Sequence, residues 1–276
     1  MSTRGIVVCV GFDDLLAITL PRNMRFLSSC LVVTSPEDTA TKEIAHSVPG
    51  VDVFETTAFT DHGAHFNKGL AIEQALDAHG REGWLLIWDA DTLFPDNLDF
   101  SSRVWGCLHG VGRKILEDVS AWHPKFNWAH AVPHRDDLGV GFFQFFHGSS
   151  SPIVNKRPWY DPTFTHAGGC DAHFLDLWPR GLVRRFPFDV LHLGPVATNW
   201  YKRASPRADG KPIEEAKDRL RLMNSFIRKY RWTWARPGMK FDTMEELPET
   251  PHRVDVPGIG TSDYELPVAR PRRGRR

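Results

Sequence analysis

The first hundred residues alternate short apolar runs with stretches of helical periodicity. Four runs are apolar or β-branched and too short for helices, which predicts buried strands. They span residues 6–10, 31–33, 51–54 and 84–88. Residues 13–20 and 67–78 carry apolar positions at helical spacing and predict helices. Strands buried on both faces and separated by helices indicate an α/β fold with a mostly parallel central sheet flanked by helices.

The segment after residues 31–33 has the composition of a helix start. Ser35 at the N-cap, Pro36 at the first helical position and Asp38 near the third favour a helix here. In parallel α/β sheets ligands bind beside the carboxyl ends of the strands, so residues that follow the strands should share one edge. They are Gly11, Thr34, Ser35, Thr56, Thr57, Asp89, Ala90 and Asp91.

The second half has a less regular pattern. It predicts strands at 104–109, 140–146 and 183–192, the last interrupted by Pro187, and helices at 170–178 and 213–230. From residue 236 onward, six prolines in 41 residues predict an extended, partly disordered tail. We therefore expect one domain over residues 1–235 and a tail over 236–276.

Charge is balanced overall but unevenly distributed. The chain has 34 basic and 34 acidic residues, and residues 270–276 alone contain five arginines and no acid. Without them the body has 29 basic against 34 acidic residues and is mildly acidic. An arginine-rich end favours a polyanion as partner, although a solvated, disordered end has the same composition.

Cysteine spacing and hydropathy exclude several classes of protein. The four cysteines form no CxxC pair, which argues against a zinc ribbon or a thioredoxin-like site. No stretch approaches the roughly 20 apolar residues of a membrane span, and no signal peptide precedes residue 13. We expect a cytoplasmic protein in a reducing compartment, without a membrane partner.

Asp89-Ala90-Asp91 is the first candidate for chemistry. It directly follows the apolar run at 84–88, and two carboxylates at i and i+2 on a turn can share one divalent cation. Mn²⁺ or Mg²⁺ held there would bridge a nucleotide diphosphate. A solvated acidic turn after a strand is the alternative.

Asn67 and Lys68 open a predicted helix. Lys68 could meet a diphosphate oxygen where the backbone N–H groups of the helix start also point outward. A surface lysine behind a capping asparagine is the alternative.

Several stretches together resemble family-2-like glycosyltransferases of the GT-A fold, and especially a group of small proteins common in phages and bacteria. They are residues 32–38, 66–69, 83–95, 141–146, 168–171, 192–194 and 199–200. The resemblance implies a Rossmann-like GT-A fold, a UDP-sugar donor, Mn²⁺ or Mg²⁺, and sugar transfer to a hydroxyl. The chain departs from the family at residues 10–13, where the usual opening turn is absent.

The resemblance also implies roles for single residues. Asp171, in Gly168-Gly169-Cys170-Asp171, would be the catalytic base of an inverting enzyme, although the family usually has two acids here and Cys170 replaces the first. An N-capping aspartate is the alternative. His192 would complete the metal site with Asp89 and Asp91, or be a satisfied buried histidine.

The remaining donor contacts follow from superfamily position. Thr34, Ser35 and Asp38 would line the nucleoside pocket, with Asn67, Lys68 and Asp89 near the diphosphate. Trp200, Lys202 and Arg203 would belong to a loop that closes over the donor, although a plain surface turn has the same composition.

The acceptor suggested by the phage resemblance and the basic tail is 5-hydroxymethylcytosine or 5-hydroxymethyluracil in DNA. Such a base must leave the stack, and Trp159, Tyr160 or Trp200 could hold it. A cell-surface glycan or a protein hydroxyl is an alternative acceptor. A metal-dependent nucleotidyltransferase is an alternative enzyme, but the first strand lacks a Gly-rich basic phosphate loop. A non-catalytic nucleic-acid-binding module is a further alternative, disfavoured by the acidic body.

Overall fold

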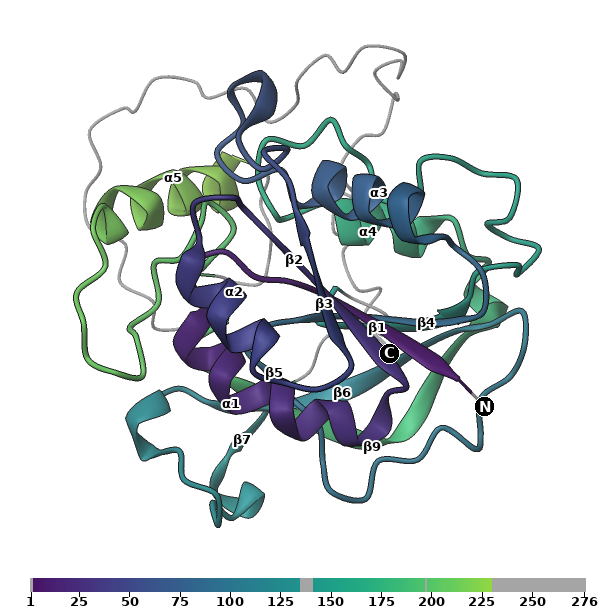
Figure 1. Cartoon of the computed structure of the whole chain (residues 1–276), viewed down its shortest axis with the longest axis horizontal. Coiled ribbons are helices and arrows are strands. Elements are labelled where there is room, and N and C mark those ends of the chain that lie inside the picture. Colours follow the sequence, from purple (N-terminus) through teal and green to yellow (C-terminus); the bar gives the residue numbers. More distant parts are fainter. Residues whose placement is uncertain (1, 135–140, 197, 230–276) are drawn as a thin grey trace, which may run out of the picture.

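The computed structural model describes residues 2–134, 141–196 and 198–229, so the predicted tail at 236–276 lies outside the described residues. Within them, nine strands form one sheet in the order β3-β2-β1-β4-β8-β6-β9-β5, with β7 paired to β6 (Figure 1). The strands are β1 (Thr3–Val8), β2 (Ser29–Thr34), β3 (Val51–Glu55), β4 (Trp84–Asp89), β5 (Thr92–Leu93), β6 (Leu108–Leu116), β7 (Val132–His134), β8 (Phe143–His147) and β9 (Val183–Leu193). The helices are α1 (Asp13–Asn23), α2 (Thr39–His46), α3 (Lys68–His79), α4 (Cys170–Asp176) and α5 (Ala216–Lys229).

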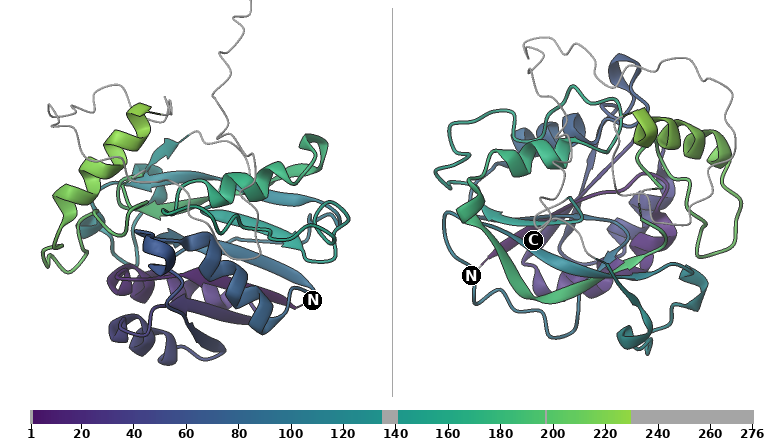
Figure 2. Two further views of the ribbon diagram at one scale, coloured as in Figure 1. Left: turned by 90° about the horizontal axis from the view of Figure 1, so that it is seen from above. Right: turned by 180° about the vertical axis from the view of Figure 1, so that it is seen from behind.

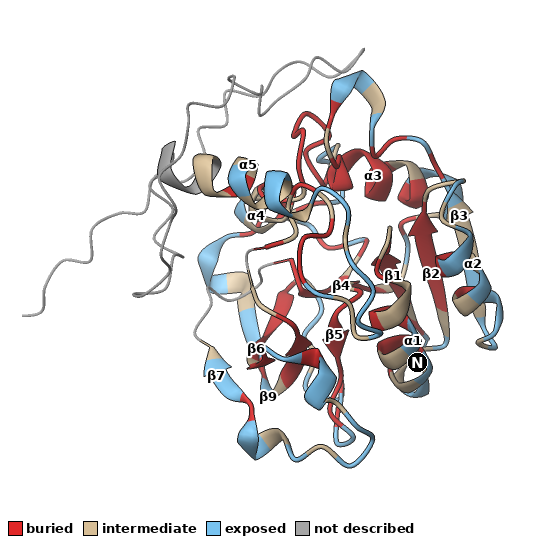
Figure 3. Ribbon diagram, turned by 90° about the vertical axis from the view of Figure 1, so that its left-hand side faces the viewer, coloured by how far each residue is buried: buried red, intermediate tan, exposed pale blue. Residues whose placement is uncertain are grey.

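The predicted α/β class is confirmed. Strands β3, β2, β1 and β4 are parallel, and side chains alternate between the two faces of the sheet. Val7 faces a cluster that contains Leu16 of α1 and Ala45 of α2, whereas Ile6 faces a cluster that contains Ile72 of α3. Helices therefore cover both faces, and the central strands are buried along most of their length (Figure 3).

The second half of the sheet is joined through an antiparallel strand. Strand β8 pairs antiparallel with β4, and β6 and β9 run parallel to each other beyond it. The register of β6 and β9 shifts between Gly110 and Gly112, opposite the segment of β9 that contains Pro187. Proline has no N–H to donate, so a local irregularity at this point preserves the pairing on either side.

Helix α5 lies at the periphery of the described chain, in yellow-green in Figure 2. In the described part of the chain, no helix combines the length and apolarity that crossing a membrane requires.

Two sequence predictions are wrong in detail. The strand predicted at 104–109 begins at Leu108 and continues to Leu116, because its later residues include Gly110, Gly112 and charged side chains that hide an apolar pattern. A Cβ at Gly112 would meet the side-chain ends of Arg185 and Asp189, which would have to shift. The predicted N-cap Ser35 is also wrong.

Asp38 is the residue that caps α2. Its side chain accepts a hydrogen bond from the Thr41 backbone N–H, and the helix begins at Thr39. The residues from Ser35 to Asp38 form a turn closed by a bond from Asp38 N–H to the Ser35 carbonyl. The sequence signature was therefore placed three residues too early.

His109 gives the fold a pH dependence. The ring is 1% exposed and stacks on Phe186, and Nε2 accepts a hydrogen bond from the Val104 N–H at 3.0 Å. Burial lowers the pKa of His109 from 6.5 to about 4. The unfolded chain therefore takes up the proton first, and the stabilising contribution is lost as pH falls from about 6.5 towards 4.

Replacing His109 by Gln, which keeps an acceptor but cannot titrate, should remove this dependence. We expect the stability difference between wild type and variant to change by roughly 2–3 kcal/mol between pH 7.5 and pH 4. Urea unfolding at a series of pH values measures it. Parallel pH profiles for the two proteins would contradict the assignment.

Candidate active site

Asp89 and Asp91 lie at the carboxyl end of the central strand β4. The chain turns at Ala90 and enters β5, which pairs antiparallel with β9 so that Thr92 lies opposite His192. This pairing brings His192 Nε2 to 3.4 Å from Asp91 Oδ2, and the Leu193 N–H donates to the Asp91 carbonyl at 2.8 Å. A pairing of two short segments a hundred residues apart thus joins two predicted site residues.

The Asp91–His192 pair suits a cation. His192 Nδ1 lies 3.0 Å from the Gly194 carbonyl, which can only accept, so the neutral ring turns Nε2 as an acceptor towards Asp91. Both residues are buried, and Asp91 Oδ1 has no hydrogen-bond partner among the described residues. Burial, and after it the carboxylate of Asp89, raises the pKa of Asp91 to about 7. Two facing acceptors are satisfied by a shared proton or by a metal ion.

Lys68 lies between two carboxylates of the site. Asn67 caps α3 by accepting from the Leu70 N–H at 2.9 Å, which fixes Lys68 at the helix start. The buried Lys68 ammonium donates to Asp89 Oδ1 at 2.7 Å and lies 3.6 Å from Asp171 Oδ1. Burial by itself would lower the pKa of Lys68, but the carboxylates of Asp171 and Asp89 raise it well above its ordinary value. The alternative of a surface lysine is excluded.

Asp171 lies in the first turn of α4, and Gly169 rather than Asp171 stands at the N-cap. Helices α3 and α4 lie side by side in Figure 1, which explains how Lys68 reaches Asp171. The Cys170 thiol donates to Asp171 Oδ1 at 3.0 Å, so a cysteine contacts the carboxylate where the resembling family has a second acid.

Three residues for which the sequence suggested no such role support Asp171. Gln144 Nε2 donates to the Asp171 carbonyl at 3.2 Å, and the Tyr160 hydroxyl donates to Gln144 Oε1 at 2.6 Å. Gly141 lies against the carboxylate, and a Cβ at that position would overlap Asp171 Oδ2. Gly141 and Gln144 lie in the stretch 141–146 that carries the resemblance, but their role depends on contacts with Asp171, far away in the sequence.

Replacing Gly141 by Ala should therefore displace the Asp171 carboxylate and lower kcat by about 10²-fold, the typical cost of a misplacement near 1 Å. Steady-state rates of sugar transfer, the reaction that the resemblance implies, measure the effect. Gly181→Ala is the matched control, since a Cβ there meets nothing within 4 Å. Equal rates for both variants would contradict the placement of Asp171 at the reacting atoms.

The structure does not bring the predicted ligands Asp89, Asp91 and His192 together around one point. Within the described ranges, no group of three or more His, Cys, Asp and Glu side chains could hold a metal ion. Asp89 is instead engaged by Lys68, while Asp91 and His192 lie together. Mg²⁺ and Mn²⁺ commonly take one or two protein ligands and complete their shell with water and phosphate, so this pair fits such an ion.

The predicted nucleoside contacts, Thr34, Ser35 and Asp38, lie at and just after the end of β2. Thr34 is fully buried at the end of β2, and its hydroxyl has no partner among the described residues. Asp38 is committed to the protein, because Oδ2 accepts from the Gly11 N–H and the Thr41 hydroxyl, each at 2.7 Å. Ser35 is half-buried in the turn between them.

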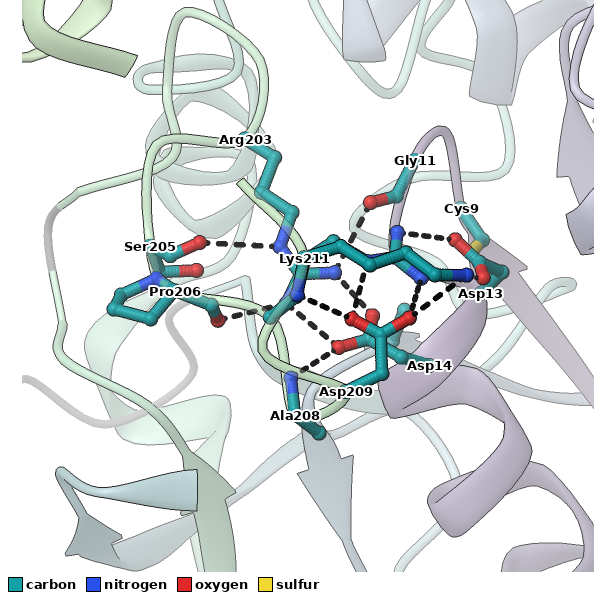
Figure 4. Close-up of polar contacts among 12 residues, drawn as sticks. Cys9, Gly11, Asp13, Asp14, Arg203, Ser205, Pro206, Ala208, Asp209 and Lys211 are labelled. Atoms are coloured by element: carbon teal, nitrogen blue, oxygen red, sulfur yellow. Dashed lines mark hydrogen bonds and ion pairs between the residues drawn. The ribbon is translucent and has the colours of Figure 1, made fainter. Parts of the chain in front are cut away.

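Arg203 is a buried structural residue. Figure 4 shows its guanidinium among oxygens from both ends of the described chain. The group donates to both Asp14 carboxylate oxygens and to the Gly11, Ser205 and Pro206 carbonyls, which can occupy all of its N–H groups. The prediction that Arg203 contacts the donor is therefore wrong, because its hydrogen bonds hold the segment around residue 203 against the start of α1.

Trp200 and Lys202 shortly precede Arg203 in the chain. Trp200 is half-buried, and its indole lies against Gly168, where a Cβ would overlap the ring. Lys202 is half-buried with φ of 70°. Trp159 and Tyr160 are fully buried, so the prediction that either could hold an extruded base is wrong. Of these three aromatic residues, only Trp200 is not fully buried.

Neither family models nor curated protein sequences match the chain. Solved structures are similar to it at low identity. Mannosyl-3-phosphoglycerate synthase from Rubrobacter xylanophilus is 14% identical, with 87% of this chain and 77% of that chain covered and a TM-score of 0.46. Inositol-1-phosphate CTP transferase from T. maritima is 10% identical over 81% and 96%, with a TM-score of 0.43. Glucosyl-3-phosphoglycerate synthase from Mycobacterium tuberculosis, in complex with Mn²⁺ and UDP, is 11% identical over 83% and 79%, with a TM-score of 0.41.

Proposed function

We propose that this protein is a metal-dependent glycosyltransferase that uses a UDP-sugar. The observation that carries the proposal is the gathering of Asp89 and Asp171, from two separate elements, around the buried ammonium of Lys68 at the carboxyl end of β4. The Asp91–His192 pair adjoins them through the same turn. Such a transfer needs carboxylates that bind a metal ion and a positive charge that binds the phosphate. It also needs a separate carboxylate that accepts the proton of the acceptor hydroxyl.

Each group has a definite role in the proposed reaction. Asp91 and His192 would hold Mn²⁺ or Mg²⁺, which supplies charge neutralisation for the leaving diphosphate. Lys68 and Asp89 would face the same diphosphate and its cation. Asp171 takes the proton of the acceptor hydroxyl as its oxygen attacks the anomeric carbon. The bond between that carbon and the phosphate oxygen breaks, and its electron pair leaves with UDP. Because the hydroxyl attacks from the face opposite UDP, the configuration is inverted.

The start of α1 favours glycosyl transfer over nucleotidyl transfer. A nucleotidyltransferase must bind a triphosphate, and a helix start with free backbone N–H groups is a common place for it. Here the first turn of α1 carries Asp13 and Asp14, which are ion-paired with Arg207 and Arg203. Two carboxylates with satisfied partners make this helix start a poor phosphate site.

The acceptor that we propose is a hydroxymethylated base in DNA, with a glycan or a protein hydroxyl as the alternative. Five arginines in residues 270–276 supply charge for a phosphate backbone. Trp200, packed on Gly168 three residues before Asp171, offers a ring on which an extruded base could stack.

All four cysteines lie in the described part and are free, buried thiols, which favours a reducing compartment such as the cytoplasm.

A transfer assay tests donor and acceptor together. The protein is incubated with Mn²⁺, a panel of UDP-sugars and DNA that contains hydroxymethylcytosine or hydroxymethyluracil, and the digested nucleosides are weighed by mass spectrometry. We expect a hexose-sized gain on the modified nucleoside. UDP release without any gain on DNA would overturn the DNA acceptor and retain the glycosyltransferase.

A further inference from the structure

The positively charged ammonium of Lys68 lies among the carboxylates of the candidate site, where a metal ion would also bind. Its ammonium lies 2.7 Å from Asp89 and 3.6 Å from Asp171, and its side chain is 7% exposed. Asp89 belongs to the Asp89–Asp91 turn, where the proposed metal ion would bind. One of the carboxylates that a metal ion would use is therefore already bound to a positive charge of the protein.

A metal ion at the Asp89–Asp91 turn and the ammonium of Lys68 would repel each other, so each opposes the binding of the other. A divalent ion that approaches Asp89 and Asp91 meets the ammonium of Lys68, and burial prevents water from screening the repulsion. A diphosphate changes this balance because it brings negative oxygens to which Lys68 can donate. Once Lys68 has that partner, Asp89 is released towards the metal ion.

We propose that Lys68 makes divalent-metal binding and diphosphate binding interdependent, so that the site excludes free metal and takes it together with the nucleotide. The proposal rests on the proposed function for the identity of the two ligands. Lys68 acts here as a positioning residue. The coupling is reciprocal: the factor by which the diphosphate raises the affinity for the metal ion equals the factor by which the metal ion raises the affinity for the diphosphate.

The test measures Mn²⁺ binding by electron paramagnetic resonance and UDP binding by calorimetry, each ligand alone and in the presence of the other, for wild type, Lys68→Met and Lys68→Gln. Loss of the ammonium should tighten Mn²⁺ binding and weaken UDP binding, each by about 5-fold or more, the lower range of measured couplings. Changes of opposite sign in one variant are the signature. Lys156→Met, which removes an exposed lysine that donates to the Leu177 carbonyl, should change neither affinity.

Other outcomes separate the two proposals. If wild type binds Mn²⁺ and UDP together and the Lys68 variants lose both or neither, Lys68 is structural and the coupling is overturned, while the glycosyltransferase stands. If wild type binds neither Mn²⁺ nor UDP, alone or together, the proposed function itself fails and the coupling fails with it. Thermal unfolding of Lys68→Gln, which keeps a hydrogen-bond donor, shows whether a loss of binding reflects a loss of fold.

Discussion

Asp171→Asn should lower kcat by 10²- to 10⁴-fold, the range that a positioned general base contributes. The amide has nearly the shape of the carboxylate and can keep the contacts with Cys170 and Gly141, but it cannot take a proton from the acceptor. Since the side chain is proposed to act on the proton rather than on the donor, the KM for UDP-sugar should change much less than kcat. Initial rates at saturating and limiting donor measure the two effects.

Asp176→Asn is the matched control for this variant. Asp176 lies on the same short helix as Asp171 but is exposed, so its replacement removes an equal charge without touching the proposed base. We expect it to keep the wild-type rate within about 3-fold, as surface substitutions usually do. An Asp171→Asn enzyme that is as fast as the control would show that the base lies elsewhere.

Arg203→Met should destabilise the protein by about 3–5 kcal/mol, the cost of removing one partner from a buried ion pair. Arg203 is 2% exposed, and its loss leaves the carboxylate of Asp14 buried without its counter-charge. The change also frees three carbonyls that hold the segment around residue 203 against α1. Urea unfolding at neutral pH measures the free energy of unfolding.

Two further variants show whether the pair or the packing is responsible. Arg25→Met breaks an ion pair with Asp96 whose side chains are 57% and 81% exposed, and it should cost less than about 1 kcal/mol. The double variant Arg203→Met, Asp14→Leu should recover much of the lost stability, because no unpaired charge remains buried. Equal costs for Arg25→Met and Arg203→Met would contradict the structural role of Arg203.

The first half of the fold could be predicted because its signals are local. Strand β4 and helix α3 follow apolar patterns, and Asn67 caps α3 through a contact three residues away. Strands β5 and β7 were not predicted, since two or three residues carry no periodicity and both exist through pairing with β9 and β6. Ser35 and Asp38 both have capping chemistry, and only the backbone decides between them.

The site was predictable where a motif stands on a strand end and unpredictable where it depends on distant contacts. Asp89 and Asp91 follow directly from β4, whereas the approach of His192 to Asp91 requires the pairing of β5 with β9. Arg203 appeared available for a ligand because its partner, Asp14, lies 189 positions away in the chain. Gly141 and Gln144 support Asp171 through contacts that no spacing in the sequence reveals.

The nucleotide product distinguishes the proposed reaction most directly. The protein is incubated with Mn²⁺ in two parallel reactions, one with UDP-hexoses and hydroxymethylated DNA, the other with UTP and hexose 1-phosphates, and phosphorus NMR identifies what is released. We predict that the first reaction releases UDP, that chelation of the metal stops it, and that the second reaction leaves UTP unchanged. Release of pyrophosphate from UTP, with no UDP from any UDP-hexose, would contradict glycosyl transfer and assign the site to nucleotidyl transfer.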